Sequence, residues 1–161
     1  MALVALALCG CGGSGSSSKS SGAKLDARFI QRVNAVCASE LAYVKAQGPF
    51  PYPQFRPLQP DRALLPRVAA ALDRVVPHAR ALPAKFRALG EPATARAEWD
   101  RVRGLIAQAK QSSARQVAFA RASNVAGFAA ESKTANRLHE LITAQGRALG
   151  ISNSSPCAQI F

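Results

Sequence analysis

The apolar residues of this chain recur every three or four positions over long stretches, which is the spacing of one face of an α-helix. The clearest stretch covers residues 65–89, where the gaps between apolar positions alternate between three and four. These positions are Leu65, Val68, Leu72, Val75, Ala79, Leu82, Phe86 and Leu89. The heptad spacing predicts a helix that packs nearly parallel or antiparallel to its neighbours. Pro77 and Pro83 lie off this face, and each removes a backbone hydrogen bond, so we expect this helix to be kinked.

Three further stretches show the same helical pattern. They cover residues 25–47, a region that starts near Ala93, and a region after Ser123-Asn124 that ends before Gly150. The apolar face of the third stretch changes to Ala and Ser after Ile106, which predicts close approach to neighbouring helices. The pattern predicts an all-α domain over residues 25–161, arranged as an up-and-down four-helix bundle.

A proline-rich loop separates the first two predicted helices. Residues 49–60 contain five prolines, which exclude a helix and favour an extended connector. The aromatic residues Phe50, Tyr52 and Phe55 can pack on the bundle or form an exposed recognition strip, and we favour packing.

The N-terminus has the pattern of an export signal. Residues 2–8 form an apolar run that is too short to cross a bilayer but fits the core of a signal peptide. The sequence Leu8-Cys9-Gly10-Cys11 resembles the lipobox of bacterial lipoproteins, with Cys11 as the lipidated residue. Cys9 fits less well because bulky Leu8 would then precede the cleaved bond, and the alternative is that both thiols are incidental. We therefore expect residues 1–10 to be a signal segment.

Residues 11–24 follow as the expected lipidated cysteine and a tether. The tether is rich in Gly and Ser, which cannot bury apolar surface, so it should behave as a flexible linker. Together these features predict a protein that is anchored by lipid to the extracytoplasmic face of the cell membrane.

The remaining two cysteines lie near opposite ends of the predicted domain. Because export exposes a protein to oxidising conditions, we expect a disulfide between Cys37 and Cys157, which closes a loop of about 120 residues. The alternative, a reactive thiol at Cys37, has no acid–base partner nearby in the sequence.

The segment Phe29–Ala38 contains Asn34-Ala35-Val36-Cys37 and resembles the first helix of small uncharacterised lipoproteins from high-GC Gram-positive bacteria. The closing element Leu149-Gly150-Ile151, followed by Cys157, resembles the end of the same group. The resemblance implies an exported, lipid-anchored helical domain, and it implies no catalytic residue.

The charge is strongly positive. The chain has 21 Lys and Arg against 9 Asp and Glu, a net charge of +12. Arg67, Arg74 and Arg103 are the candidate contacts with anionic surfaces, such as anionic lipid headgroups or acidic cell-wall polymers. A merely solvated basic face is the alternative. Phosphate neutralisation would also permit nucleic-acid binding, but export argues against it, so we expect no nucleic-acid partner.

Candidate chemistry is sparse. Glu98 and Asp100 are two residues apart on a helix and diverge. His78 and His139 have no ligand-type partner three or four residues away, so we interpret them as surface imidazoles. We expect no cofactor, no metal site and no enzymatic activity. The sequence therefore predicts a non-enzymatic binding or structural module at the cell envelope, with a polyanion-binding or nucleic-acid-binding helical protein as the alternative.

Overall fold

The computed structural model describes residues 22–48 and 61–160. Over these ranges it contains helices and no strand, as the hydrophobic pattern predicts. The elements in chain order are α1 (Ala27–Ala46), the short 3-10 helix η1 (Arg62–Leu64), α2 (Leu65–Ala88), α3 (Arg96–Arg121), α4 (Val125–Ala148) and α5 (Pro156–Ile160). The all-α bundle is therefore confirmed. None of the described helices is long and apolar enough to cross a membrane. The N-terminal predictions at Cys9 and Cys11, and the loop 49–60, lie outside the described residues.

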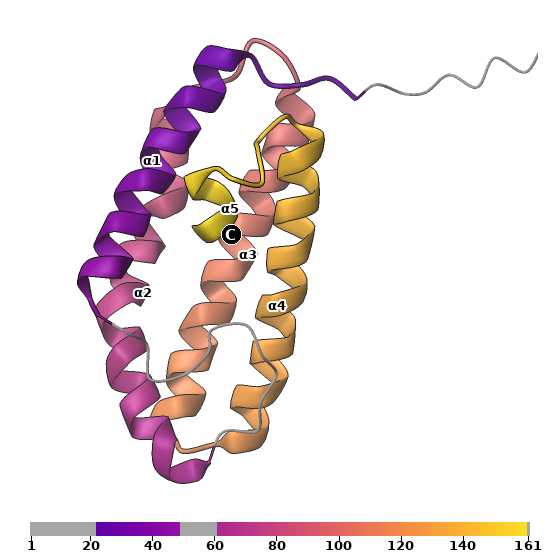
Figure 1. The fold of residues 1–161 in the computed structure, drawn as a ribbon. Helices are drawn as coiled ribbons and strands as arrows, with labels where there is room; N and C mark the ends of the chain where they lie inside the picture. The colour runs from indigo at the N-terminus through magenta and orange to yellow at the C-terminus, as the bar shows by residue number, and fades with distance from the viewer. Residues whose placement is uncertain (1–21, 49–60, 161) are drawn as a thin grey trace, which may run out of the picture.

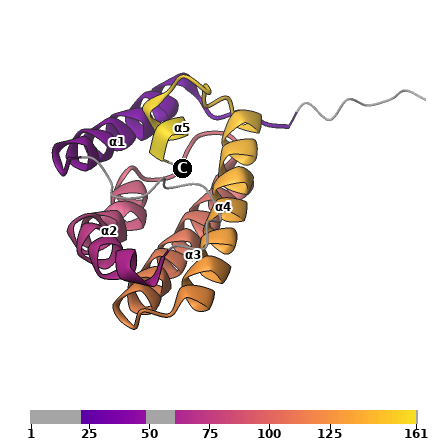
Figure 2. The same ribbon diagram turned by 60° about the horizontal axis from the view of Figure 1, so that its bottom comes forward.

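The four long helices run alternately down and up the bundle (Figure 1). The sequence pattern does not predict the short helix α5, which returns between α1 and α4 instead of extending the bundle (Figure 2). It packs directly against α1. The most extensive helix pairings are α3 with α4 and α2 with α3, whereas α1 packs less extensively on α2.

Local sequence explains where α1 and α4 begin. The carboxylate of Asp26 accepts a hydrogen bond from the Phe29 backbone N–H at 2.8 Å. The Asn124 side chain accepts one from the Gly127 N–H at 2.9 Å. Both are N-cap interactions, which satisfy a backbone donor that has no partner within the helix. Gly150 follows α4 with φ +94, a conformation that glycine adopts without strain. These caps agree with the sequence pattern.

The third helix starts later than the sequence predicts. It begins at Arg96 and not near Ala93, because Ala95 adopts a left-handed conformation with φ 58 that separates α3 from the preceding turn. The connection is tied to the N-terminal segment, since Thr94 Oγ1 donates a hydrogen bond to the Lys24 carbonyl oxygen at 2.5 Å. Lys24, which the sequence places at the end of the tether, therefore already contacts the bundle.

The second helix continues through both of its internal prolines. Pro77 and Pro83 lie inside α2, which runs without a break to Ala88. The prolines therefore do not divide the helix, and the kink that we expect there stays a prediction.

The core is divided between two clusters of buried side chains. The larger one, here called the Trp99 cluster, includes residues of α1, α2, α3, α4 and α5. Its buried members are Leu25, Phe29, Val33, Cys37, Leu82, Phe86, Ala95, Trp99, Val102, Ile106, Ile142, Leu149, Ile151 and Cys157. The smaller one, the Phe128 cluster, lies toward the turn between α3 and α4 and contains Leu65, Val68, Ala69, Ala120 and Phe128.

The core departs from the sequence pattern in two details. Leu141, which the helical spacing places on the apolar face of the fourth helix, is 40% exposed. The middle of the heptad face of α2, at Leu72, Val75 and Ala79, is only partly buried. These three residues line a cavity between the two clusters, so the regular sequence pattern does not correspond to a continuous core.

Candidate functional site

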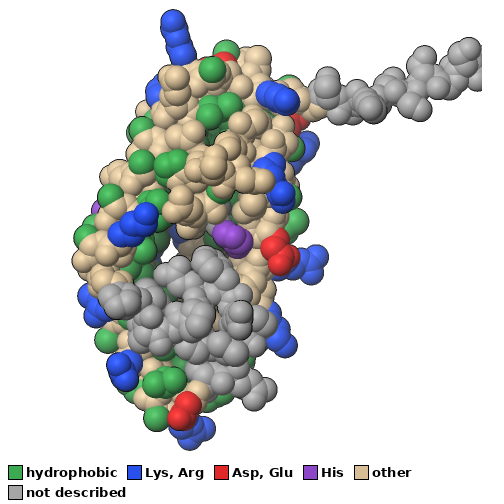
Figure 3. All heavy atoms as spheres, viewed as in Figure 1, with side chains coloured by type: hydrophobic (Ala, Val, Ile, Leu, Met, Phe, Trp, Pro, Cys, Tyr) green, Lys and Arg blue, Asp and Glu red, His purple; other side chains and the backbone are tan. Residues whose placement is uncertain are grey.

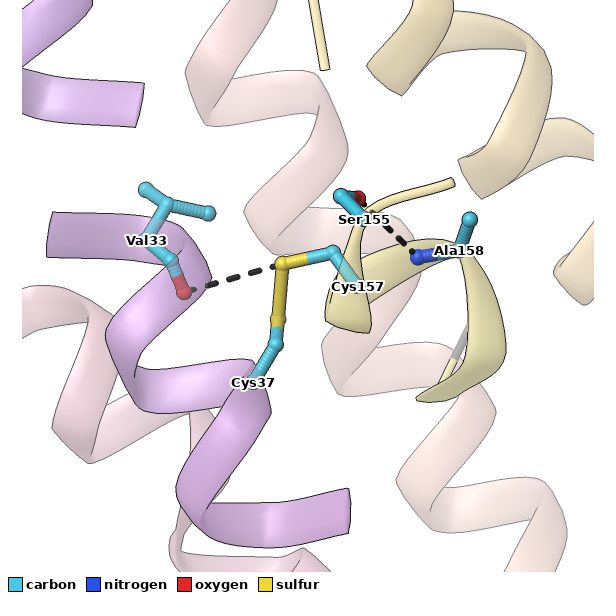
Figure 4. The surroundings of a disulfide bond; sticks show 5 residues. All are labelled: Val33, Cys37, Ser155, Cys157 and Ala158. Atoms are coloured by element: carbon cyan, nitrogen blue, oxygen red, sulfur yellow. Dashed lines mark hydrogen bonds between the residues drawn. A yellow bond between two sulfur atoms is a disulfide. The ribbon is translucent and has the colours of Figure 1, made fainter. Parts of the chain in front are cut away.

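A disulfide joins α1 to α5. Cys37 and Cys157 are bonded, their Cα atoms are 4.9 Å apart, and both residues are fully buried. Figure 4 shows the bond between the two helices, with the Cys157 sulfur 3.6 Å from the Val33 carbonyl oxygen. The predicted disulfide is confirmed, and in this state Cys37 has no free thiol that could react.

The three arginines predicted to contact anions are not equivalent. Arg67 and Arg74 are exposed on α2, as expected. The Arg103 guanidinium instead forms ion pairs with Glu91 at 3.1 Å and with Asp100 on its own helix. Because its charge is balanced by two carboxylates, Arg103 is a poor candidate for attracting an external anion.

Three other cations lie along the packed helices α2 and α3. Arg80 and Arg87 are seven residues apart on α2, and therefore share one side of the helix. Lys110 Nζ of α3 donates a hydrogen bond to the Arg80 carbonyl oxygen. The pKa of Lys110 is lowered from its usual value, first by burial and then by the positive charges of Arg87 and Arg80, and no carboxylate contributes to this shift. We call Arg80, Arg87 and Lys110 the cationic cluster, which sequence spacing within a single helix could not reveal.

The remaining basic side chains are widely distributed. Figure 3, viewed as in Figure 1, shows Lys and Arg side chains over the whole length of the visible face, with only a few Asp and Glu side chains among them. Two further ion pairs join neighbouring helices: Arg115 with Glu131 at 2.8 Å and Arg121 with Asp73 at 2.7 Å. With 21 basic against 9 acidic residues in the chain, such pairing leaves a surplus of positive charge.

A charged group is buried between α1 and α2. Glu40 is only 3% exposed, and its carboxylate binds His78 Nδ1 at 2.6 Å through one oxygen and Lys85 Nζ through the other. The ring of Tyr43 stacks on His78 with centroids 3.7 Å apart, and its hydroxyl donates to the Arg74 carbonyl oxygen at 2.9 Å. His78 is therefore a structural partner of Glu40, although its side chain remains 32% exposed at the surface, as predicted.

Sequence reasoning misses this group because His78 and Lys85 follow Glu40 by 38 and 45 residues. The signal that could have found it is Glu40 itself. It follows Phe29, Val33 and Cys37 at helical spacing, so it occupies the buried face of α1, where an unpaired carboxylate would be costly.

His139 on α4 is also partly buried. Burial lowers the pKa of His139, and the nearby negative charge of Glu140 opposes this shift. The fold therefore favours the neutral form of the His139 imidazole, whereas a fully solvated histidine would keep its ordinary pKa.

The chemistry available to the described residues is limited. His78 is hydrogen-bonded to Glu40, as the histidine of a catalytic triad is to its carboxylate. Among the described side chains, however, no serine, threonine or cysteine is hydrogen-bonded to the His78 ring in the place of a nucleophile. Within the same ranges, no group of three His, Cys, Asp or Glu residues could hold a metal ion.

The cavity beside the buried charged group has a volume of about 300 Å³. Its walls come from all five α-helices. Apart from His78, the α2 wall is apolar and includes Leu72, Val75 and Ala79, while the opposite wall contains Ser132 and Ala135 of α4. The cavity exists because small side chains on α4 face this part of α2. Figure 3 shows a hollow in the middle of this face of the molecule.

Comparisons with protein families, with curated proteins and with solved structures find no match.

Proposed function

We propose that this protein is a lipid-anchored, extracytoplasmic and non-enzymatic binding module that uses its basic helix surface on anionic lipid or acidic cell-wall polymers. The observation that carries the proposal is the surplus of cations on α2 and α3. Arg67 and Arg74 are exposed, and the charges of Arg80 and Arg87 act on Lys110 with no carboxylate to offset them. An approaching anion would relieve this repulsion, and each basic residue near an anionic membrane contributes about 1 kcal/mol.

The anchor is part of the same proposal and rests on the sequence. Lipidation at Cys11 would hold the domain near the membrane through residues 12–21, so that weak contacts with headgroups or wall polymers act at a high local concentration. A disulfide that is buried and closes most of the chain supports a protein that works in an oxidising compartment.

The test for the anchor is the mass of the N-terminus. After expression in a bacterium that lipidates proteins, the membrane fraction should contain a chain that begins at a diacylated Cys11. Cys11→Ser should remove the lipid and release the chain from membranes. A full-length chain that stays unmodified, with residues 1–10 attached, would refute the anchor.

The test for anion binding uses the oxidised Cys11→Ser protein without residues 1–10, so that neither the lipid nor the apolar signal segment contributes. Binding to phosphatidylglycerol-containing vesicles, to a teichoic-type polymer and to duplex DNA is measured across a salt series, with phosphatidylcholine vesicles as the neutral control. We expect salt-sensitive binding to the anionic vesicles and to the polymer, and weaker binding to the neutral vesicles. No binding at low salt would refute the proposal, and a strong preference for DNA would favour the nucleic-acid alternative.

Charge reversal locates the surface. The Arg80→Glu/Arg87→Glu double variant should reduce vesicle affinity by at least about thirtyfold, since two contacts of roughly 1 kcal/mol each are lost and repulsion is added. Arg103→Glu/Arg121→Glu is the matched control, because it changes the net charge by the same amount and both arginines are already paired with carboxylates. An equal loss in both variants would show that net charge, and not this surface, determines binding.

A further inference from the structure

We propose that the cavity between α2 and α4 is a binding site for a small uncharged amphiphile, with an apolar body and one polar head that can form hydrogen bonds. This inference is independent of the anionic-surface proposal, because it concerns the interior of the bundle and a different class of ligand. Its basis is the size of the cavity, the chemistry of its walls and the state of its charged groups.

The size of the cavity sets the size of the ligand. A volume of about 300 Å³ lies at the lower end of the range for small-molecule sites. It equals the share of roughly ten water molecules in the liquid, and so holds a body of about ten non-hydrogen atoms. A short acyl chain or a single fused ring system fits this space.

The α2 wall provides the apolar contacts. Leu72, Val75 and Ala79 continue the heptad face that is buried at both ends of the helix, at Leu65 and Phe86. In the middle of the face these side chains are only partly buried, and they border the cavity. An apolar ligand would cover the part of this face that the other described helices leave uncovered.

Three neutral polar side chains, from α3, α4 and α5, also line the cavity. Gln116, Asn136 and Gln159 present amide groups, which both donate and accept hydrogen bonds. Gln116 Nε2 donates to Ser132 Oγ at 3.3 Å, so these groups form a small polar edge next to the apolar wall. A hydroxyl or amide head of a ligand matches this edge.

The charged residues that line the cavity are already satisfied. Among the described lining residues, the acidic and basic ones are Glu40 and His78. The Glu40 carboxylate is engaged through both oxygens, by His78 and by Lys85. A charged head would therefore lose its hydration without gaining an opposite charge, which is why the site favours an uncharged ligand.

The experiment titrates the full oxidised protein with octan-1-ol, octanoate and octylammonium, and follows backbone amide shifts by nuclear magnetic resonance. The three probes share an apolar chain and differ in the charge of the head. We expect octan-1-ol to bind with a Kd below about 1 mM, given what a ligand of this size can gain. The shifts should be concentrated at residues 72–79 and 132–136. Octanoate and octylammonium should bind at least tenfold more weakly.

Variants that fill the cavity separate this site from adsorption to the surface. Ala79→Phe should reduce octan-1-ol affinity by tenfold or more, and Ala135→Leu should do the same from the opposite wall. Ala70→Phe adds the same ring at an exposed position of α2 and should leave binding unchanged. Circular dichroism confirms the fold of each variant, and having two filling variants guards against one that fails to fold.

Three results would overturn the inference. They are the absence of localised shifts at the solubility limit of octan-1-ol, equal binding in the Ala79→Phe, Ala135→Leu and Ala70→Phe variants, and tighter binding of either charged probe than of the alcohol. None of these results bears on vesicle binding, so the two proposals can fail separately.

Discussion

The two halves of this bundle are held together in different ways. At the disulfide end, Trp99 is fully buried and contacts Phe29 and Phe86 edge to face, with centroids 5.3 and 5.6 Å away. Such pairs of aromatic rings contribute about 0.5–1.5 kcal/mol beyond the area that they bury. At the other end the Phe128 cluster is smaller and includes two alanines, and its neighbours toward the middle border the cavity.

The difference follows from side-chain size on α3 and α4. Near the disulfide end these helices contribute Trp99, Ile106 and Ile142, which fill the space between the helices. Further along they contribute small residues that leave it open, namely Ser113, Ser132 and Ala135. In this region a polar interaction also joins α3 to α4, since Arg115 donates two hydrogen bonds of 2.9 and 2.8 Å to the Glu131 carboxylate. The disulfide end therefore has the larger packed core, and the middle of the bundle contains the cavity.

Removal of the disulfide is the strongest way to weaken the disulfide end. Cys37→Ser/Cys157→Ser should lower the free energy of unfolding by about 4 kcal/mol, because the bond that closes a loop of 120 residues no longer restricts the unfolded chain. Urea unfolding of the variant and of the reduced wild-type protein measures this loss. A negligible change in both would show that the bond contributes little to the stability of this end.

Two leucines of α2 compare the halves directly. Leu82 is 6% exposed within the Trp99 cluster. Leu82→Ala should therefore cost about 3 kcal/mol, as expected for a large side chain removed from a packed core. Leu72 is only partly buried and already borders the cavity, so Leu72→Ala should cost about 1 kcal/mol. Equal losses in urea unfolding would show that the middle of the bundle is as tightly packed as the disulfide end.

Much of the disulfide end is predictable from sequence, because its determinants are local or few in number. Helical spacing identifies the buried positions Val33, Cys37 and Trp99, and only two cysteines are left in the domain to pair. The helix caps at Asp26 and Asn124 are also readable from the sequence.

The candidate sites are not predictable in the same way. The cavity depends on which small residues of α4 face α2, and the group around Glu40 joins residues that only the packing of α1 on α2 brings together. Arg103 is predicted to contact an external anion. Helical spacing indicates its partner Asp100, three residues earlier, but its other partner Glu91 lies before α3, where that spacing gives no guide. The incomplete burial of the apolar face of α2 has the same origin, since periodicity shows which face is apolar and not what covers it.

The turn between α3 and α4 supplies a test at the opposite end. A Cβ on Gly127 would lie 2.5 Å from the Phe119 ring. Gly127→Ala should therefore cost about 2 kcal/mol through overpacking. Gly104→Ala is the matched control, because a Cβ there meets nothing within 4 Å, and alanine should stabilise that helix by about 1 kcal/mol. Thermal unfolding of both variants measures these changes in stability. A Gly127→Ala variant that is more stable than the wild type would show that the Phe128 cluster can rearrange.

Acid should weaken the fold through His139. Since burial lowers the pKa of His139, the unfolded chain takes up a proton at higher pH than the folded one does. Stability is therefore lost as the pH falls below the ordinary histidine value of 6.5 toward the lower pKa of the folded state. His139→Gln should reduce the difference between urea midpoints measured at neutral and at mildly acidic pH. An unchanged difference would assign the acid sensitivity to other groups.

The smallest expected effect comes from the same backbone change made once in each half. Ser123 before α4 and Ala95 before α3 both have positive φ, 50 and 58, which strains a residue with a Cβ. Ser123→Gly should relieve this strain and raise stability by about 0.5 kcal/mol, after the greater entropy of glycine in the unfolded chain is included. Ala95 is 8% exposed in the Trp99 cluster. Ala95→Gly should gain nothing, because it loses a buried methyl worth about 0.8 kcal/mol. Thermal unfolding compares the two, and an equal gain would mean that the Ala95 methyl contributes no packing to the disulfide end.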